Sequence, residues 1–137
     1  MEVTAIPFVK HIGIKEEESQ LSLSPMLEVE NYIGTIHASA QFTLAETQSR
    51  LFLQEEFKDL EGEVLPLLRS SSVKYKAPAT TTLRAEATIN DEVKSKFMEQ
   101  FSRRGRATVT VDVKLVDVEN VVTMVGEFVW FVQRLKS

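Results

Sequence analysis

The chain has 137 residues, a formal net charge of −4 and no cysteine. This length predicts a single domain over residues 1–137 that can bury its own core without a metal or a disulfide. The missing cysteines exclude a thiol nucleophile and a cysteine zinc site, and the acidic balance, without a block of lysine or arginine, argues against nucleic-acid binding. No apolar run reaches the roughly 20 residues of a membrane span and the first residues do not resemble a secretory signal, so we expect a cytoplasmic protein that does not bind membranes.

The first half of the chain predicts two short strands and one long helix. The strands cover residues 12–15 and 21–23 and are joined by the polar segment 16–20. The helix runs from His37 to Phe57, because no glycine or proline interrupts that stretch, and it ends before an acidic loop at 58–63. At 100° per residue, six side chains share an arc of about 100° and form the predicted buried face: Ala38, Phe42, Ala45, Ser49, Phe52 and Leu53.

The second half predicts four strands with a small helix inserted after the second of them. Residues 73–77 and 80–89 form the first two strands, separated by Pro78, and residues 70–72, all serine, are expected at a bend in a strand. The inserted helix is expected to lie over the sheet. Its signals are an N-cap, three apolar side chains four apart and a glycine after its end: Asn90 or Asp91, then Val93, Phe97 and Phe101, then Gly105.

The last two strands form a long hairpin. Residues 106–116 alternate between apolar and polar, which is typical of a strand buried on one face, and a polar turn follows at 117–120. Residues 121–133 are apolar on both faces, so this strand is expected to be buried on both, inside the fold or against a partner subunit. The complete order of elements predicts an α+β fold in which an antiparallel sheet wraps around one long central helix.

The long helix carries the candidate site residues. Glu46 lies about 20° from Leu53 on the helical wheel and borders the apolar arc, so it is either a rim residue or a carboxylate placed in a cleft. His37 lies on the opposite side of the wheel and cannot form a dyad with Glu46. The free N–H of Ala38, at the helix start, could hold an oxyanion. The two histidines, His11 and His37, are too far apart in sequence to suggest a metal site.

The stretch around the helix start resembles a known family. It reads Asn31, then Gly34-Thr35-Ile36-His37-Ala38, then Ala40, Phe42 and Leu44-Ala45-Glu46. This pattern is similar to that of hot-dog-fold thioesterases, most closely the phenylacetic-acid-degradation (PaaI) type and the DUF4442 and YiiD C-terminal types. In those proteins an Asn and a Gly-Thr-x-His-Gly-Gly-like turn lead into the central helix, and an acidic residue follows nine positions after the His. The resemblance covers nearly the whole chain.

The resemblance implies a hot-dog fold and an acyl-CoA thioesterase. The substrate would be a medium- or long-chain acyl or an aryl thioester of CoA or of an acyl carrier, with no cofactor besides the CoA of the substrate. The N–H of Ala38, directly after His37, would polarise the thioester carbonyl. Glu46 would activate water or attack the carbonyl itself, and Asn31 would orient the water or the carbonyl. Hot-dog chains pair edge to edge, which implies a homodimer or, by pairing of dimers, a homotetramer.

Two further points come with the resemblance. Four basic residues are candidates to bind the phosphates of CoA: Lys74, Lys76, Arg103 and Arg104. Ala38-Ser39 stands where the family has paired glycines, and the added Cβ could hinder approach of a thioester. The alternative function is therefore a catalytically weak module that binds acyl thioesters or serves as an oligomeric scaffold. The hydratase branch of the fold is disfavoured, because it needs an acid where this chain has Tyr32.

Overall fold

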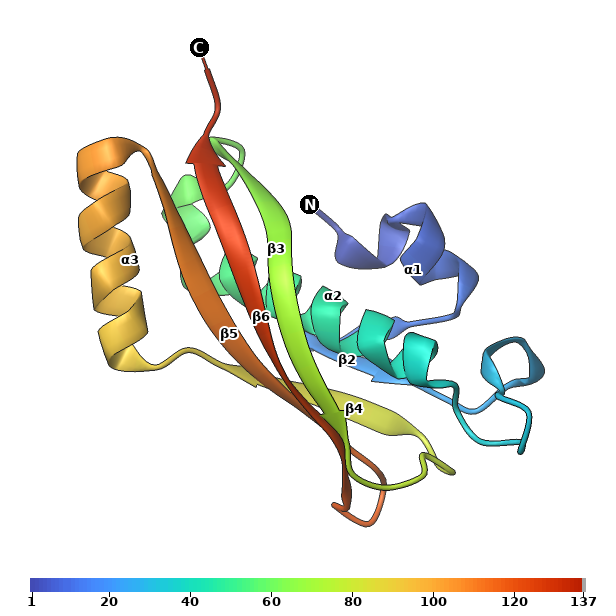
Figure 1. The fold of residues 1–137 in the computed structure, drawn as a ribbon. Coiled ribbons are helices and arrows are strands. Elements are labelled where there is room, and N and C mark those ends of the chain that lie inside the picture. The colour runs from blue at the N-terminus through green and yellow to red at the C-terminus, as the bar shows by residue number, and fades with distance from the viewer. Residues whose placement is uncertain (137) are drawn as a thin grey trace.

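A computed structural model describes residues 1–136 as one antiparallel sheet curved around the long helix α2 (Figure 1). The strand order is β1-β2-β4-β5-β6-β3, so β1 and β3 are the two edges. The helices are α1 (Pro7–His11), α2 (Ala38–Glu56) and α3 (Asp91–Arg104), with 3-10 turns at Val3–Ala5, Leu27–Val29 and Lys58–Leu60. The strands are β1 (Lys15–Glu17), β2 (Gln20–Leu23), β3 (Val64–Tyr75), β4 (Leu83–Thr88), β5 (Arg106–Val116) and β6 (Val122–Arg134). The α+β prediction of a sheet around one central helix is confirmed.

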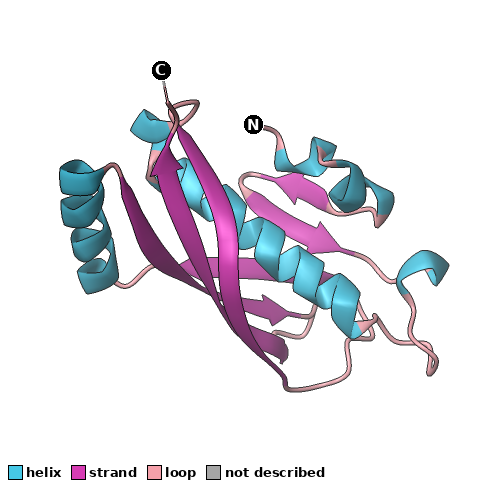
Figure 2. Ribbon diagram, turned by 45° about the horizontal axis from the view of Figure 1, so that its top comes forward, coloured by secondary structure: helices cyan, strands magenta, loops and turns pink. Residues whose placement is uncertain are grey.

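Helix α2 begins where the sequence predicts it. His37 is its N-cap, and the imidazole Nδ1 accepts a hydrogen bond of 2.9 Å from the N–H of Ser39. Figure 2 shows α2 crossing between the three long strands and the small β1-β2 hairpin, so the helix has neighbours on most of its sides. Four partly exposed side chains, spaced four residues apart, form a stripe along this helix: Phe42, Glu46, Arg50 and Gln54. We call these four residues the open stripe.

The predicted buried face of α2 is wrong in part. Ala38 is exposed, and Phe42 and Phe52 are only partly buried. Polar residues take much of the buried surface instead: Gln41, Thr43, Thr47, Gln48 and Ser49. Hydrogen bonds make this burial tolerable. The side chain of Gln48, for example, accepts from Leu21 N (2.7 Å) and donates to the carbonyl of Ser19 (3.1 Å). Apolar spacing therefore predicts the extent of this helix but not the polar residues on its buried face.

The N-terminal prediction is also corrected. The first strand is β1 at Lys15–Glu17 rather than 12–15, because residues up to His11 form the short helix α1, which Ile12 caps. A two-residue turn at Glu18 and Ser19, both with positive φ, connects β1 to β2. The turn lies inside the predicted connection at 16–20, but it is shorter than expected, because turns of this kind favour Asn and Gly and neither is present to mark it.

Strand β3 is longer than predicted. It runs from Val64 to Tyr75 instead of from 73 to 77, and it pairs with β6 over its whole length. Pro66 and the serines at 70–72 are residue types typical of loops, so the sequence did not predict a strand there. Proline is nevertheless tolerated on an edge strand. The bend expected at residues 70–72 is not found there, since the three serines pair regularly, but the register shifts just before them, between Leu68 and Ser70. The strand predicted at 80–89 is shorter in the structure and is β4.

The C-terminal predictions are confirmed. The side chain of Asn90 caps α3 by accepting from Glu92 N and Val93 N, and Gly105 ends the helix with a φ of 72°. Strands β5 and β6 form the long hairpin, with the inner face of β6 buried. The outer face of β6 is not buried within the chain, where its apolar side chains remain partly exposed: Val125, Val129 and Phe131.

Candidate active site

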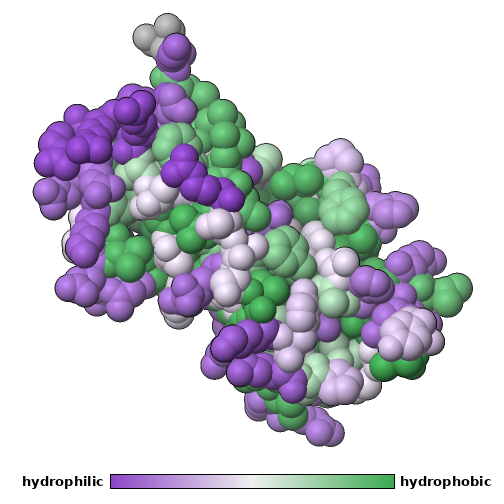
Figure 3. Space-filling view, in the orientation of Figure 1, coloured by the Kyte–Doolittle hydropathy of each residue, from purple (hydrophilic) through white to green (hydrophobic). Residues whose placement is uncertain are grey.

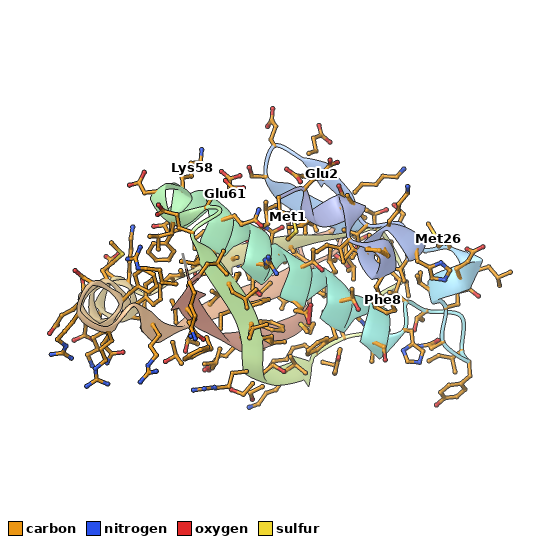
Figure 4. All side chains as sticks on the ribbon, turned by 90° about the horizontal axis from the view of Figure 1, so that it is seen from above. Met1, Glu2, Phe8, Met26, Lys58 and Glu61 are labelled. Carbon is orange, nitrogen blue, oxygen red and sulfur yellow. The ribbon has the colours of Figure 1, made fainter. Side chains whose placement is uncertain are left out.

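Glu46 lies in the middle of α2 on the wall of a cavity of about 300 Å³. The cavity lies between α1, α2 and β6. Its other walls are Phe8 and Val9 of α1, Trp130 of β6, and α2 from Phe42 to Arg50. In Figure 4 the labelled Phe8 lies beside the N-terminal half of α2. Of the two predicted placements of Glu46, rim residue or cleft residue, the geometry combines both, since the half-buried side chain borders a partly open, mainly apolar hollow.

The carboxylate of Glu46 has no partner within residues 1–136. It makes no hydrogen bond there, and it is absent from the ion pairs of the fold. Burial raises the pKa of Glu46 above its usual value of 4.5, and the positive charge of Arg50, one helical turn further on, opposes this rise without cancelling it. A poorly solvated carboxylate with a raised pKa is a stronger base than an exposed one and can serve as a general base or a nucleophile.

Two buried hydrogen bonds fix the helical turn that carries Glu46. Trp130 Nε1 donates to Ser49 Oγ (2.8 Å), and Ser49 Oγ donates to the carbonyl oxygen of Glu46 (2.6 Å). The ring of Phe42 packs on that of Phe128, with centroids 5.5 Å apart. These contacts tie α2 to β6 and set the position of Glu46. Trp130 is a residue of this site that the sequence patterns did not indicate, because its partner Ser49 lies 81 positions away in the chain.

The start of α2 offers a free backbone donor. The N–H of Ala38 has no acceptor within residues 1–136, while Tyr75 Oη at the end of β3 donates to the carbonyl of Ala38 (3.0 Å). Burial raises the pKa of Tyr75. A second cavity of about 250 Å³ borders this helix start and shares Phe8 and Thr43 with the cavity at Glu46. The two hollows are neighbours along α2, and we refer to them together as the helix groove.

Asn31 organises the loop that leads to the helix. Its Oδ1 accepts from Ile33 N (3.1 Å) and Thr35 N (2.9 Å), and its Nδ2 donates to Thr35 Oγ1 (2.7 Å). Gly34 supplies the positive φ of 81° that this turn requires. The side chain of Asn31 therefore shapes the loop before His37, and its predicted role toward the substrate stays a prediction.

The donor and the carboxylate do not meet in one chain. Ala38 and Glu46 are eight residues apart, which is about 12 Å along a helix axis. His37 is a further residue away, and its imidazole Nδ1 is used by the helix cap. A single thioester carbonyl cannot contact both the Ala38 N–H and the Glu46 carboxylate of the same helix.

The four basic candidates fall into two separate pairs. Lys74 and Lys76 border a hollow of about 610 Å³ on the outer face of the sheet, at the end of β3. Arg103 and Arg104 are exposed at the end of α3, next to the start of β5. The start of β5 is level with Leu65, nine residues along β3 from Lys74. This separation is about 30 Å, so one chain does not gather the four into one cluster.

Strand β3 leaves one edge of the sheet open. It pairs with β6 on one side and with no strand of the described residues on the other. Leu65 and Leu67 on this strand are 46% and 52% exposed. Figure 3 shows apolar surface around the upper ends of β3 and β6, next to the hydrophilic surface of α3. A long edge strand with exposed leucines is suited to pairing with another chain.

Residues 1–136 show neither a metal-binding cluster nor a membrane-spanning helix. No group of three or more His, Asp or Glu side chains in residues 1–136 is arranged to hold a metal ion. None of the helices in that part of the chain is long and apolar enough to cross a membrane.

Comparisons with known proteins agree with this architecture. A family model described as "Domain of unknown function (DUF4442)" matches residues 3–132. No curated protein matches the chain in sequence. Among solved structures, PA5026 of Pseudomonas aeruginosa, named a protein of unknown function and probable thioesterase, has a TM-score of 0.83 at 22% identity and covers 97% of this chain and 91% of its own.

Two other solved structures are similar. The thioesterase HI1161 of Haemophilus influenzae has a TM-score of 0.75 at 18% identity and covers 99% of this chain and 89% of its own. BH2602 of Bacillus halodurans, crystallised with CoA, has a TM-score of 0.73 at 18% identity and covers 93% of this chain and 76% of its own. These likenesses establish the hot-dog fold.

Proposed function

This chain belongs to the DUF4442 family, and we propose that it is a thioesterase that hydrolyses acyl-CoA. The observation that carries the proposal is the unpaired, partly buried carboxylate of Glu46 in the helix groove, with a free backbone N–H at the start of the same helix. Structures named as thioesterases and a structure with CoA among the similar folds support the same function.

The proposed reaction uses one backbone donor and one carboxylate. The Ala38 N–H binds the thioester carbonyl oxygen and stabilises the negative charge that develops there. Glu46 takes a proton from a water molecule as the water oxygen attacks the carbonyl carbon. When the tetrahedral intermediate collapses, the C–S bond breaks and Glu46 returns the proton to the thiolate of CoA. Alternatively, the Glu46 carboxylate attacks the carbonyl carbon itself, and water then hydrolyses the resulting anhydride.

A homodimer would complete this site. Because about 12 Å separates Ala38 from Glu46 on one helix, the donor must come from one protomer and the carboxylate from the other. The open edge of β3 provides the surface for two-fold pairing, in which two β3 strands run antiparallel side by side. Such pairing places the end of β3 in one protomer toward the start of β3 in the other.

The same pairing suggests a binding site for the CoA phosphates. Lys74 and Lys76 lie at the end of β3, and Arg103 and Arg104 lie near the level of its start. An antiparallel pair of β3 strands would bring the lysines of one protomer toward the arginines of its partner. Each CoA binding site would then hold four cations, two lysines from one protomer and two arginines from its partner, and these would bind the CoA phosphates.

The direct test is an assay of hydrolysis on a panel of aliphatic and aryl acyl-CoA thioesters, in which the free thiol released from CoA is measured. Glu46→Gln should lower kcat by about 10²–10⁴-fold, because it removes the base but keeps the shape of the side chain. Glu55→Gln, on the exposed end of the same helix, is the matched control and should match the wild type. Retained activity in Glu46→Gln would contradict the assignment of Glu46.

The same panel distinguishes the thioesterase from the alternative function, a module that only binds acyl thioesters. The alanine at position 38 replaces a glycine of the resembled family, which favours a module that binds acyl thioesters without turning them over. If acyl-CoA raises the melting temperature of the wild-type protein but no thiol is released, the binding module is the correct function.

A further inference from the structure

We propose that Arg50 forms a subsite in the helix groove for acyl groups that carry a hydrogen-bond-accepting oxygen on their tail. The inference rests on the proposed function, because it places the thioester carbonyl at Glu46. It adds the chemical class of the acyl group, which the fold and the comparisons leave open.

Arg50 is a half-buried cation whose charge acts on the Glu46 carboxylate, one helical turn earlier, without a direct contact between the two side chains. Within residues 1–136 its side chain makes no hydrogen bond and no ion pair, and its Nε is buried without an acceptor. The guanidinium lies over the ring of Trp130, with its central carbon 5.9 Å from the ring centroid. It lines the cavity at Glu46 and also a smaller hollow of about 50 Å³ on its other side, next to Leu53 and Phe57.

The other polar groups of the cavity cannot replace Arg50 as donors. Thr43 Oγ1 donates to the carbonyl of Ser39 (3.0 Å), and Thr47 Oγ1 donates to the carbonyl of Thr43 (2.6 Å). Glu46 is the only acidic side chain on the cavity wall, and it accepts rather than donates when ionised. The guanidinium, which stays protonated at all accessible pH values, is therefore the one cationic donor among the side chains that line this cavity.

The chemistry of the acyl tail follows from this donor. A purely aliphatic tail would bury the guanidinium further and give its N–H groups no acceptor, which is unfavourable. A tail with a carboxylate, hydroxyl or keto oxygen would satisfy it, while Trp130 and Phe42 would contact the apolar carbons. Arg50 lies one turn, about 6 Å, beyond Glu46, so the oxygen must be several bonds from the thioester carbon.

The test uses three CoA thioethers that cannot be hydrolysed: S-hexyl-CoA, S-(5-carboxypentyl)-CoA and S-(6-hydroxyhexyl)-CoA. Their affinities for the full-length protein are measured by titration calorimetry. Wild type should bind the carboxypentyl compound at least about tenfold more tightly than the hexyl compound, because hydrogen bonds to charged groups are the stronger class. A similar gain for the hydroxyhexyl compound would show that a neutral oxygen suffices, and no gain would show that the site requires an anion.

Variants assign the preference to Arg50. Arg50→Met should abolish the preference for the oxygenated tails and leave the affinity for S-hexyl-CoA within about threefold. Arg50→Lys keeps the charge and should keep the preference for the carboxylate. Arg69→Met is the control, since Arg69 lies over Phe131 on the outer face of the sheet.

The proposal is overturned if wild type binds all three compounds equally, if it binds none, or if Arg50→Met keeps the preference. It is also overturned if Arg50→Met dissociates the dimer on gel filtration but leaves the selectivity among the three compounds unchanged. The guanidinium would then contact a partner subunit rather than the acyl tail. Since the thioethers are not substrates, a clear preference together with no hydrolysis of any acyl-CoA would refute only the proposed thioesterase function.

Discussion

The separation of Ala38 from Glu46 along α2 predicts that two inactive variants can complement each other. A thioester carbonyl in a productive complex lies about 3 Å from its oxyanion donor and close to the attacking oxygen. The roughly 12 Å between the two residues on one helix is far beyond that reach. If each site takes its donor from one protomer and its carboxylate from the other, a dimer with one lesion in each chain retains one intact site.

Ala38→Pro is a selective way to delete the donor. Ala38 is the first residue of α2, a position that favours proline, and its N–H has no partner within residues 1–136. His37, with φ −60° and ψ 142°, already has the backbone conformation that a following proline requires. Loss of one oxyanion donor should lower kcat by about 10²–10³-fold, and Glu46→Gln should lower it by about 10²–10⁴-fold.

The heterodimer of the two variants, isolated with two affinity tags, should have about half the activity of the wild-type dimer, because one of its two sites is intact. Subunits mixed at random in equal amounts should recover about a quarter, since half of the dimers are then mixed. Ala38→Ser, which keeps the N–H, is the control and should stay close to wild type. A heterodimer as inactive as its parents would refute the shared site.

Three other outcomes are expected. The profile of kcat/KM against pH should rise through an apparent pKa above 4.5, and Arg50→Met should move that limb to higher pH by removing the charge that opposes the shift. Because the folded chain holds the Glu46 proton more tightly than the unfolded chain, Glu46 adds stability below its unfolded pKa that is lost as pH rises through the folded value. Glu46→Gln should therefore melt at a higher temperature than wild type at pH 7, and a lower melting temperature there would contradict the raised pKa. Gly126→Ala should reduce the free energy of unfolding by about 1–3 kcal/mol in urea titrations, because its Cβ would lie 2.9 Å from the Phe128 ring and 3.0 Å from Val73 Cγ1; an unchanged midpoint would show that this packing is loose.

The sequence predicted correctly those elements whose structure is determined by their own residues, and it missed those that depend on partners distant in the chain. The β5-β6 hairpin and α3 were found because their apolar periods and the caps at Asn90 and Gly105 lie within the elements themselves. Most of β3 was missed because its stability comes from pairing with β6, a neighbour about 60 residues away in the chain. Glu46 was indicated by its position beside the apolar arc of the helix and by its spacing from His37 in the resembled pattern, and its catalytic role stays a prediction.

The groove around Glu46 could not be predicted in the same way. One of its walls is α1, a helix of only five residues that propensity does not reveal. Arg50 was also missed, although a cation four residues after an acid on a helix is a recognisable pair. The hydrogen bond from Trp130 to Ser49 joins residues 81 positions apart, and no local pattern signals it.

The distribution of unsatisfied polar groups gives an independent reason to place function on α2. Folded proteins pair nearly all of their buried polar atoms. Three buried side-chain atoms in residues 1–136 have no partner, namely Gln41 Oε1, Arg50 Nε and Thr123 Oγ1, and two of these three belong to α2. The same helix satisfies its other buried polar side chains, such as Gln48 and Ser49, with short hydrogen bonds. Packing alone does not account for this contrast, because an apolar residue at position 50 would avoid the penalty. The acceptor on the acyl tail proposed above would satisfy Arg50 Nε, whereas Gln41 Oε1 and Thr123 Oγ1 have no structural explanation.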